Sequence, residues 1–152
     1  MSLEEYRLLT AKKKRAKYGN EKPIYRGIKW HSRLEMRYFK HLEWKYKLKE
    51  IRSVARQVPI DLEVGGEKIC TYRIDFVVTE LSGLKTYIEV KGAETKLWKY
   101  KWKHFQILFR KLTASKSSLL LVKEARTKNE RFYTREVIAR TDKDRKRGKK
   151  AK

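Results

Sequence analysis

The chain has few of the features that cross-link a protein through disulfides or zinc, or that anchor it in a membrane. Cys70 is the only cysteine among 152 residues, which excludes an intramolecular disulfide and a zinc site built from several cysteines. No apolar run approaches the roughly 20 residues of a membrane span, and no secretory hydrophobic segment follows Met1. We therefore expect no membrane association and a soluble, cytoplasmic protein, in the host cytoplasm if a phage encodes it.

Histidines and acidic residues are also scarce. His31, His41 and His104 lack ligand spacing, so a histidine-based zinc or HNH-type nuclease site is not expected, and we predict each on the surface or on a helix. Only 18 acidic residues face 41 lysines and arginines, a formal net charge of +23. Such a charge indicates a polyanionic partner, and nucleic acid is favoured over a membrane surface because the apolar residues are patterned for a core.

The length fits one folded domain with basic ends. We predict a basic arm over residues 1–23, a folded domain over 24–140 and a basic, disordered tail over 141–152. The arm could lie on phosphates or simply keep the protein in solution.

A helix is predicted from Ser32 to about Lys49, after a short extended piece over 24–30. Its apolar surface is formed by residues at helical spacing, namely Leu34, Met36, Tyr38, Phe39, Leu42, Trp44 and Tyr46. Ser32 and Glu35 fit a capping box, in which the serine caps the helix and the glutamate reaches back to the serine amide. Capping and a catalytic role for Glu35 are therefore alternatives.

Three strands are predicted next. The first covers 51–62, where Pro59 suits an edge or a bulge. After a turn at Gly65 and Gly66, residues 68–78 and 84–91 form a hairpin that carries Asp75, Glu89 and Lys91.

A second helix is predicted from an N-cap at Thr95 to about Leu112. Its core-facing stripe consists of Trp98, Trp102, Phe105, Phe109 and Leu112. The apolar run 118–122 is typical of a strand buried on both faces, which favours a crossover and parallel pairing. Residues 134–140 are ambiguous between helix and strand.

The hairpin carries the most informative residues. Side chains alternate along a strand, so Glu89 and Lys91 share a face and can converge with Asp75. Such a site would hold a hard divalent cation through carboxylate oxygens, with an ammonium nearby to polarise a water. The alternative is a solvated strand face, but apolar residues flank each acid, and a carboxylate in such a place needs a partner or a metal.

The order of these elements and motifs resembles the PD-(D/E)xK nuclease superfamily. The chain is more closely similar to a phage-encoded endonuclease family formerly of unknown function, and beyond it to phage junction-resolving and transposon-end-cleaving nucleases. The matching stretches are 27–35, 56–59, 72–76, 88–92 and 95–105. The superfamily's frequent proline before the aspartate is replaced here by Ile74.

The resemblance implies an αβββαβ, restriction-endonuclease-like α/β core with a mixed central sheet flanked by helices. It assigns Asp75 and Glu89 to a metal site for Mg²⁺, with Mn²⁺ as a plausible substitute. It gives Lys91 the role of activating water or steadying the scissile phosphate, and Glu35 a further metal-facing or water-orienting role. Gln57 would support the site, and cleavage would leave a 5′-phosphate and a 3′-hydroxyl.

From these features we predict a Mg²⁺-dependent, structure-selective DNA endonuclease, in particular a Holliday-junction resolvase of a phage or mobile element. Symmetrical cutting of two strands predicts a homodimer acting on branched or double-stranded DNA. The residues expected to contact DNA are Lys12, Lys13, Lys14, Arg15, Arg26, Arg33, Gln57, Lys96, Lys99, Lys101 and Lys103. A nicking or transposon-end nuclease, and a non-catalytic nucleic-acid-binding protein on a degenerate nuclease core, are the alternatives.

Overall fold

The computed structural model describes residues 21–113, 117–125 and 132–138. The predicted arm, apart from residues 21–23, and the predicted tail lie outside the described residues, and so do the predicted DNA contacts Lys12, Lys13, Lys14 and Arg15.

The described chain opens with a small hairpin and a helix. Strands β1 (Ile24–Tyr25) and β2 (Ile28–Lys29) lie within the predicted extended piece and pair antiparallel. Arg26 and Gly27 between them both have positive φ, which is the geometry of the tightest hairpin turns. The helix α2 (Arg33–Lys47) follows, with Ser32 as its N-cap.

Helix α2 buries a shorter stripe than predicted. Leu34, Tyr38 and Leu42 are buried, but Trp44 and Tyr46 are 58% and 55% exposed. The predicted apolar surface is therefore buried only in its first part, and Trp44 and Tyr46 lie exposed in the last turn of α2.

Three antiparallel strands form the first half of the sheet. They are β3 (Ile51–Val64), β4 (Glu67–Glu80) and β5 (Lys85–Val90), with Gly65 and Gly66 turning the first hairpin in positive φ. The strand order is β3-β4-β5-β6-β7, so β3 is an edge strand, where Pro59 costs no inner ladder bond.

The second half contains the predicted crossover. Helix α3 (Lys96–Leu112) begins after the N-cap Thr95, and β6 (Ser118–Glu124) pairs parallel with β5. The ambiguous stretch near the end is resolved as strand β7 (Phe132–Ile138), antiparallel to β6. The chain thus has the predicted α/β fold, a five-stranded mixed sheet with two helices in αβββαβ order, extended by β7.

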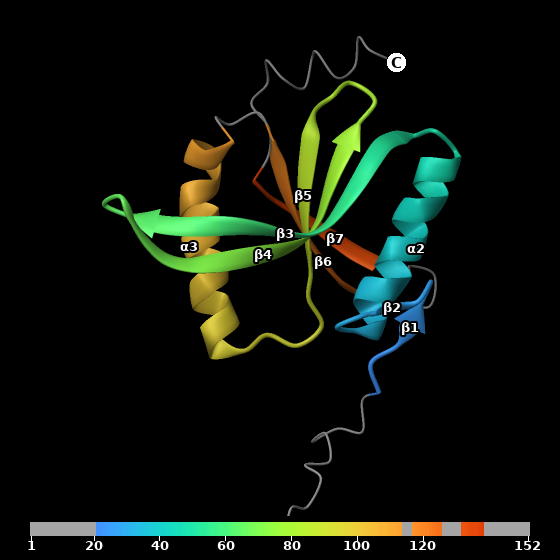
Figure 1. Cartoon of the computed structure of the whole chain (residues 1–152), viewed down its shortest axis with the longest axis horizontal. Helices are drawn as coiled ribbons and strands as arrows, with labels where there is room; N and C mark the ends of the chain where they lie inside the picture. The colour runs from blue at the N-terminus through green and yellow to red at the C-terminus, as the bar shows by residue number, and fades with distance from the viewer. Residues whose placement is uncertain (1–20, 114–116, 126–131, 139–152) are drawn as a thin grey trace, which may run out of the picture.

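Each helix covers one hydrophobic cluster, and Figure 1 shows the sheet between the two helices. Leu119 and Leu121 of β6 belong to the α3 cluster, whereas Val122 belongs to the α2 cluster, so this strand is covered on both faces. Leu112, predicted on the buried stripe of α3, is instead 52% exposed because it lies in the last turn.

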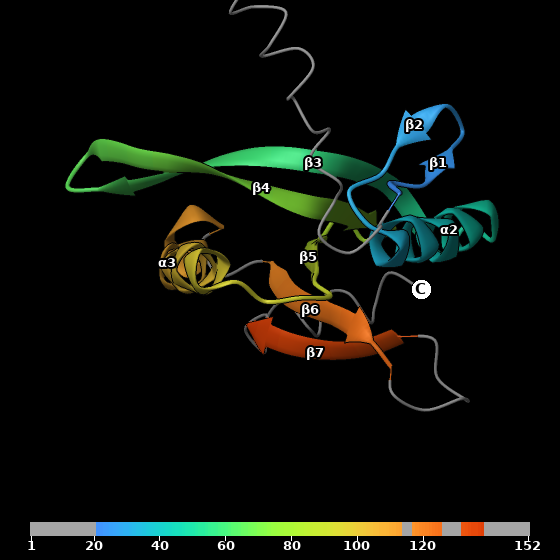
Figure 2. The ribbon, with the colours of Figure 1, turned by 90° about the horizontal axis from the view of Figure 1, so that it is seen from below.

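The long β3–β4 hairpin changes sides along its length. Phe76 and Val78 pack in the α2 cluster, whereas Tyr72 and Ile74 pack in the α3 cluster. Figures 1 and 2 show the hairpin running from α2 across α3. Asp75 lies between Ile74 and Phe76, where the hairpin passes from the α3 cluster to the α2 cluster.

Candidate metal and nucleic-acid site

Asp75 and Glu89 come together on adjacent strands. Phe76 pairs with Ile88, so the two acids are the next residues beyond this pair on β4 and β5. The Asp75 Oδ2 atom accepts a hydrogen bond from the Val90 amide at 2.9 Å. Both acids line a pocket of about 630 Å³, together with the predicted site residues Glu35 and Lys91.

Gln57 connects Asp75 with Glu35 across the α2 side of the pocket. Its Nε2 atom donates to Asp75 Oδ1 at 2.9 Å and to Glu35 Oε1 at 3.1 Å. Gln57 adopts φ of 48°, a conformation that few non-glycine residues take and that is often found at functional sites. The amide therefore lies between the two carboxylates and fixes both.

Glu89 is held from the α3 side. Its Oε1 atom accepts a 2.8 Å hydrogen bond from the indole Nε1 of Trp98, which lies in the first turn of α3 after the Thr95 cap. The Lys91 Nζ atom lies 5.2 Å from the centroid of the Trp98 ring, a cation–π distance. Trp98 therefore orients both Glu89 and Lys91.

The carboxyls of half-buried Asp75 and buried Glu89 have shifted pKa values. Burial raises the pKa of Glu89 from 4.5 to about 8, and the nearby Asp75 carboxylate adds to this shift. Burial also raises the pKa of Asp75, and the charge of Glu35 contributes in the same direction. The pKa values are raised because these groups are removed from water and lie near like charges. A cation between them would stabilise the ionised forms.

The Glu89 Oε2 atom is the clearest sign of an unfilled bonding position. It is buried, and among the described residues it has no hydrogen-bond partner. The hydroxyl of Tyr72 is also buried and has no hydrogen-bond partner in that part of the chain. Burial raises the pKa of Tyr72, and the charge of nearby Glu89 adds to this shift. A buried carboxylate oxygen without a partner is unfavourable, and coordination of a hard cation would satisfy it.

The donor set fits Mg²⁺ or Mn²⁺ held mainly by two residues. Within the described ranges no group of three or more His, Cys, Asp or Glu side chains is placed to hold one ion. Asp75 and Glu89 offer two carboxylates, which suffices for Mg²⁺ because this ion usually keeps several waters and also binds substrate phosphates. Glu35 is linked to Asp75 through Gln57 and is 2% exposed.

The capping box at the start of α2 is half formed. The Ser32 Oγ atom accepts from the Glu35 amide at 3.0 Å, so the serine caps as predicted. The Glu35 carboxylate bonds Gln57 instead, and in the described part of the chain it does not bond the Ser32 amide. The backbone of Glu35 serves the cap while its side chain faces the pocket, so the two expected alternatives are divided between different atoms.

The predicted DNA contacts separate into three groups. Lys101 lines the pocket, and Lys96, Lys99 and Lys103 are exposed on α3, where Lys99 lies 3.4 Å from Glu94. Arg26 forms a 2.7 Å ion pair with Glu43 away from the pocket. Arg33 lines a separate hollow at the start of α2.

Several pocket residues were missed from the sequence. They are His31, Tyr72, Arg73 and Trp98. His31 is exposed, as predicted for the histidines, yet its Nδ1 atom lies 3.6 Å from Glu35 Oε2. Trp98 fits the apolar stripe of α3, and its spacing carries no sign that its indole N–H reaches Glu89. The alternation of Tyr72 and Arg73 along β4 was the one available signal.

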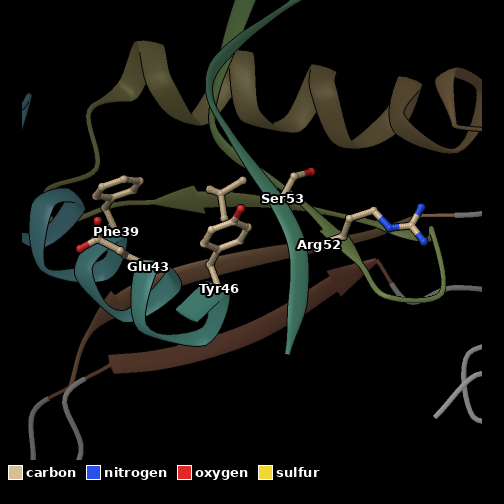
Figure 3. Close-up of a pocket in the computed structure, with 6 residues that line it drawn as sticks. Phe39, Glu43, Tyr46, Arg52 and Ser53 are labelled. Atoms are coloured by element: carbon tan, nitrogen blue, oxygen red, sulfur yellow. The ribbon is translucent and has the colours of Figure 1, made fainter. Parts of the chain in front are cut away.

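A further hollow, of about 290 Å³, lies between α2 and β3 and is lined by Phe39, Tyr46 and Arg52 among others (Figure 3). Its one acid, Glu43, is already bonded to the Tyr25 hydroxyl at 2.8 Å and paired with Arg26. None of the predicted site residues lines it, so the chemistry of the hairpin belongs to the larger pocket.

Fold and site together define an α/β protein with a pair of carboxylates on adjacent strands, a neighbouring lysine and a cationic rim. More specifically, the chain belongs to a family described as "Protein of unknown function (DUF1064)", which matches residues 15–123. No curated protein matches it. A solved structure, "Crystal structure of SSO0001", is 18% identical over 75% of this chain, with a TM-score of 0.38. The chain covers 55% of that structure's chain.

No helix in the described residues is both long and apolar enough to cross a membrane.

Proposed function

We propose that this protein is a metal-dependent DNA endonuclease of the PD-(D/E)xK type. The observation that carries the proposal is the pair of half-buried Asp75 and buried Glu89, with the unpartnered Glu89 Oε2 atom, beside Lys91 in one pocket. Two acids facing a polyanion would repel it unless a cation lies between them. A chain of net charge +23 is suited to the polyanion itself.

The residues divide the chemistry of phosphodiester hydrolysis among themselves. Asp75 and Glu89 would hold Mg²⁺ or Mn²⁺, which when bound supplies charge neutralisation and lowers the pKa of a water. Lys91 would steady the scissile phosphate or the attacking water. Water adds to phosphorus, the P–O3′ bond breaks, and the leaving oxygen takes a proton, giving a 5′-phosphate and a 3′-hydroxyl.

The favoured substrate is branched DNA, a four-way junction of a phage or mobile element. This preference is supported by the abundance of basic residues in a sequence without a base-reading motif. Cutting two strands symmetrically would require a homodimer with two such pockets. A nicking or transposon-end nuclease would use the same residues on duplex DNA.

A non-catalytic nucleic-acid-binding protein is the second candidate. It is favoured by one observation, namely that no three-residue metal-ligating group exists in the described part of the chain. In such a protein Glu89 would remain protonated at neutral pH and serve only to fill the pocket.

Cleavage of labelled four-way junction, duplex and single-stranded DNA in Mg²⁺ separates these candidates. We expect wild type to cut the junction preferentially, and Asp75→Asn or Glu89→Gln to lose about 100- to 1,000-fold in rate while still binding it. Glu63→Gln, an exposed acid on β3, is the matched control and should cut normally. Undiminished cutting by both site variants would reject the assignment, and absence of cutting by wild type would favour the binding protein.

A further inference from the structure

Arg56 is an arginine held by stacking instead of by an acid. Its guanidinium carbon lies 3.7 Å from the centroid of the Trp30 ring and 5.4 Å from that of Phe39. Trp30 is 1% exposed, so this platform is part of the α2 core. Stacking of this kind orients a guanidinium while leaving its in-plane N–H donors available.

Those donors have no partner among the described residues. The Arg56 side chain forms no ion pair or hydrogen bond there, and its buried Nε atom is unsatisfied. Arg26 and Arg37, in contrast, each pair with a carboxylate, Glu43 and Glu124 respectively. Stacking fixes the guanidinium while its Nη donors stay unbonded in the described chain, so they can take an acceptor from outside the chain.

Arg56 does not line the pocket itself, but the chain connects it to the site at two points. It directly precedes Gln57, which bonds both Glu35 and Asp75. Its platform Trp30 directly precedes His31, which lines the pocket. The two chain segments that hold Arg56 are therefore the ones that border the proposed metal site on the α2 side.

We propose that Arg56 binds a non-bridging oxygen of a backbone phosphate next to the scissile one. This inference rests on the proposed function and adds a contact outside the metal pocket. The Nη groups of the guanidinium can donate to the oxygens of that phosphate without disturbing the stacking on Trp30, while the Nε atom stays buried. The contact fixes the register of the strand and carries no base preference.

The test compares Arg56→Met, Arg56→Lys and Arg52→Met by fluorescence anisotropy on a four-way junction without added metal, over a range of salt. We expect Arg56→Met to lose about tenfold in affinity and to reduce the slope of log K against log salt by about one. Arg56→Lys should keep the slope but recover only part of the affinity. Arg52, on the same strand and bonded to the Leu81 carbonyl, is the control and should change little.

A single neutral methylphosphonate, moved along the junction strand, then locates the contact. At one phosphate beside the cut, neutralisation should weaken wild type but leave Arg56→Met unaffected, because both changes remove the same interaction. Equal sensitivity of the two proteins at every position, with a lower melting temperature for Arg56→Met, would overturn the proposal and make Arg56 a cover for Trp30.

These results are separable from the fate of the proposed function. A wild type that binds DNA through Arg56 but never cuts would reject the nuclease and keep this contact. A wild type that cuts, with Arg56→Met binding and cutting equally well, would reject the contact alone.

Discussion

The two walls of the pocket differ in how fully their polar atoms are bonded. On the α2 and β3 wall, the Gln57 amide donates hydrogen bonds to both Glu35 and Asp75. The second oxygen of Asp75 accepts a hydrogen bond from the Val90 amide. On the α3 and β5 wall, Glu89 has one oxygen on Trp98 and the other unpartnered in the described chain. The first wall is a completed framework and the second has bonding capacity left, which is where a cation would be bound most firmly.

The same difference assigns separate tasks to the acids. Asp75 has its orientation fixed by two donors before any ligand binds, so it serves as the preorganised ligand. Glu89 has the higher pKa of the pair and depends more on a cation to ionise. Changes to each wall should therefore produce different defects.

Breaking the bonded wall should have the largest effect. Gln57→Ala removes the amide from both Glu35 and Asp75, and we expect cleavage to fall about 10- to 100-fold, as for loss of other groups that orient metal ligands. Gln57→Asn, whose residue type tolerates positive φ, is the matched variant for the backbone and should keep the fold but not the reach of the amide. The rate of junction cutting and the melting temperature are the two measurements.

If Gln57→Ala cuts normally, the amide has no orienting role and the first wall is only packing. A melting temperature that falls for Gln57→Ala and not for Gln57→Asn would instead place the effect in the strained backbone.

Loosening the other wall should be milder and should act through the metal. Trp98→Phe keeps an aromatic ring for Trp102 and Lys91 but removes the N–H that holds Glu89. We expect the Mg²⁺ concentration for half-maximal cutting to rise about tenfold, with the rate at saturating Mg²⁺ nearly restored. An unchanged Mg²⁺ requirement with a lower maximal rate would show that Trp98 does not act through Glu89.

The proton affinity of Glu89 gives the smallest and most specific prediction. Its folded pKa is raised, so the folded state binds the proton more tightly than the unfolded state, and the free energy of unfolding should fall as pH rises from 4.5 to about 8. Glu89→Gln should flatten this part of the metal-free stability curve in urea titrations. Added Mg²⁺ should stabilise wild type more at high pH, because its ligand must be deprotonated.

Parallel pH profiles for wild type and Glu89→Gln would mean that Glu89 titrates normally and is not buried as described.

The elements that were predicted well are those with an uninterrupted pattern. Helix α3 begins after Thr95 and ends at Leu112 as expected, because its cap residue and aromatic spacing agree. The acid-bearing hairpin was also predictable, since apolar residues flank both Asp75 and Glu89. Residues 134–140 fit two periodicities, and only pairing with β6 decided for a strand.

The candidate site was predictable in its acids and not in its supports. The positions of Asp75, Glu89 and Lys91 follow from strand alternation, which is a local property. The hydrogen bond from Trp98 to Glu89 and the two hydrogen bonds from Gln57 depend on how the β3–β4 hairpin passes between the helices. That path is set by tertiary packing and not by the local sequence. The pairing of Arg26 with Glu43 is tertiary in the same sense.

Binding of Mn²⁺, measured by electron paramagnetic resonance with and without junction DNA, tests most directly whether the Asp75–Glu89 pair holds a cation. We predict saturable binding by wild type and by Glu63→Gln, and its loss in both Asp75→Asn and Glu89→Gln at unchanged melting temperature. Equal Mn²⁺ binding by all four proteins, or none by wild type even with DNA, would contradict the account.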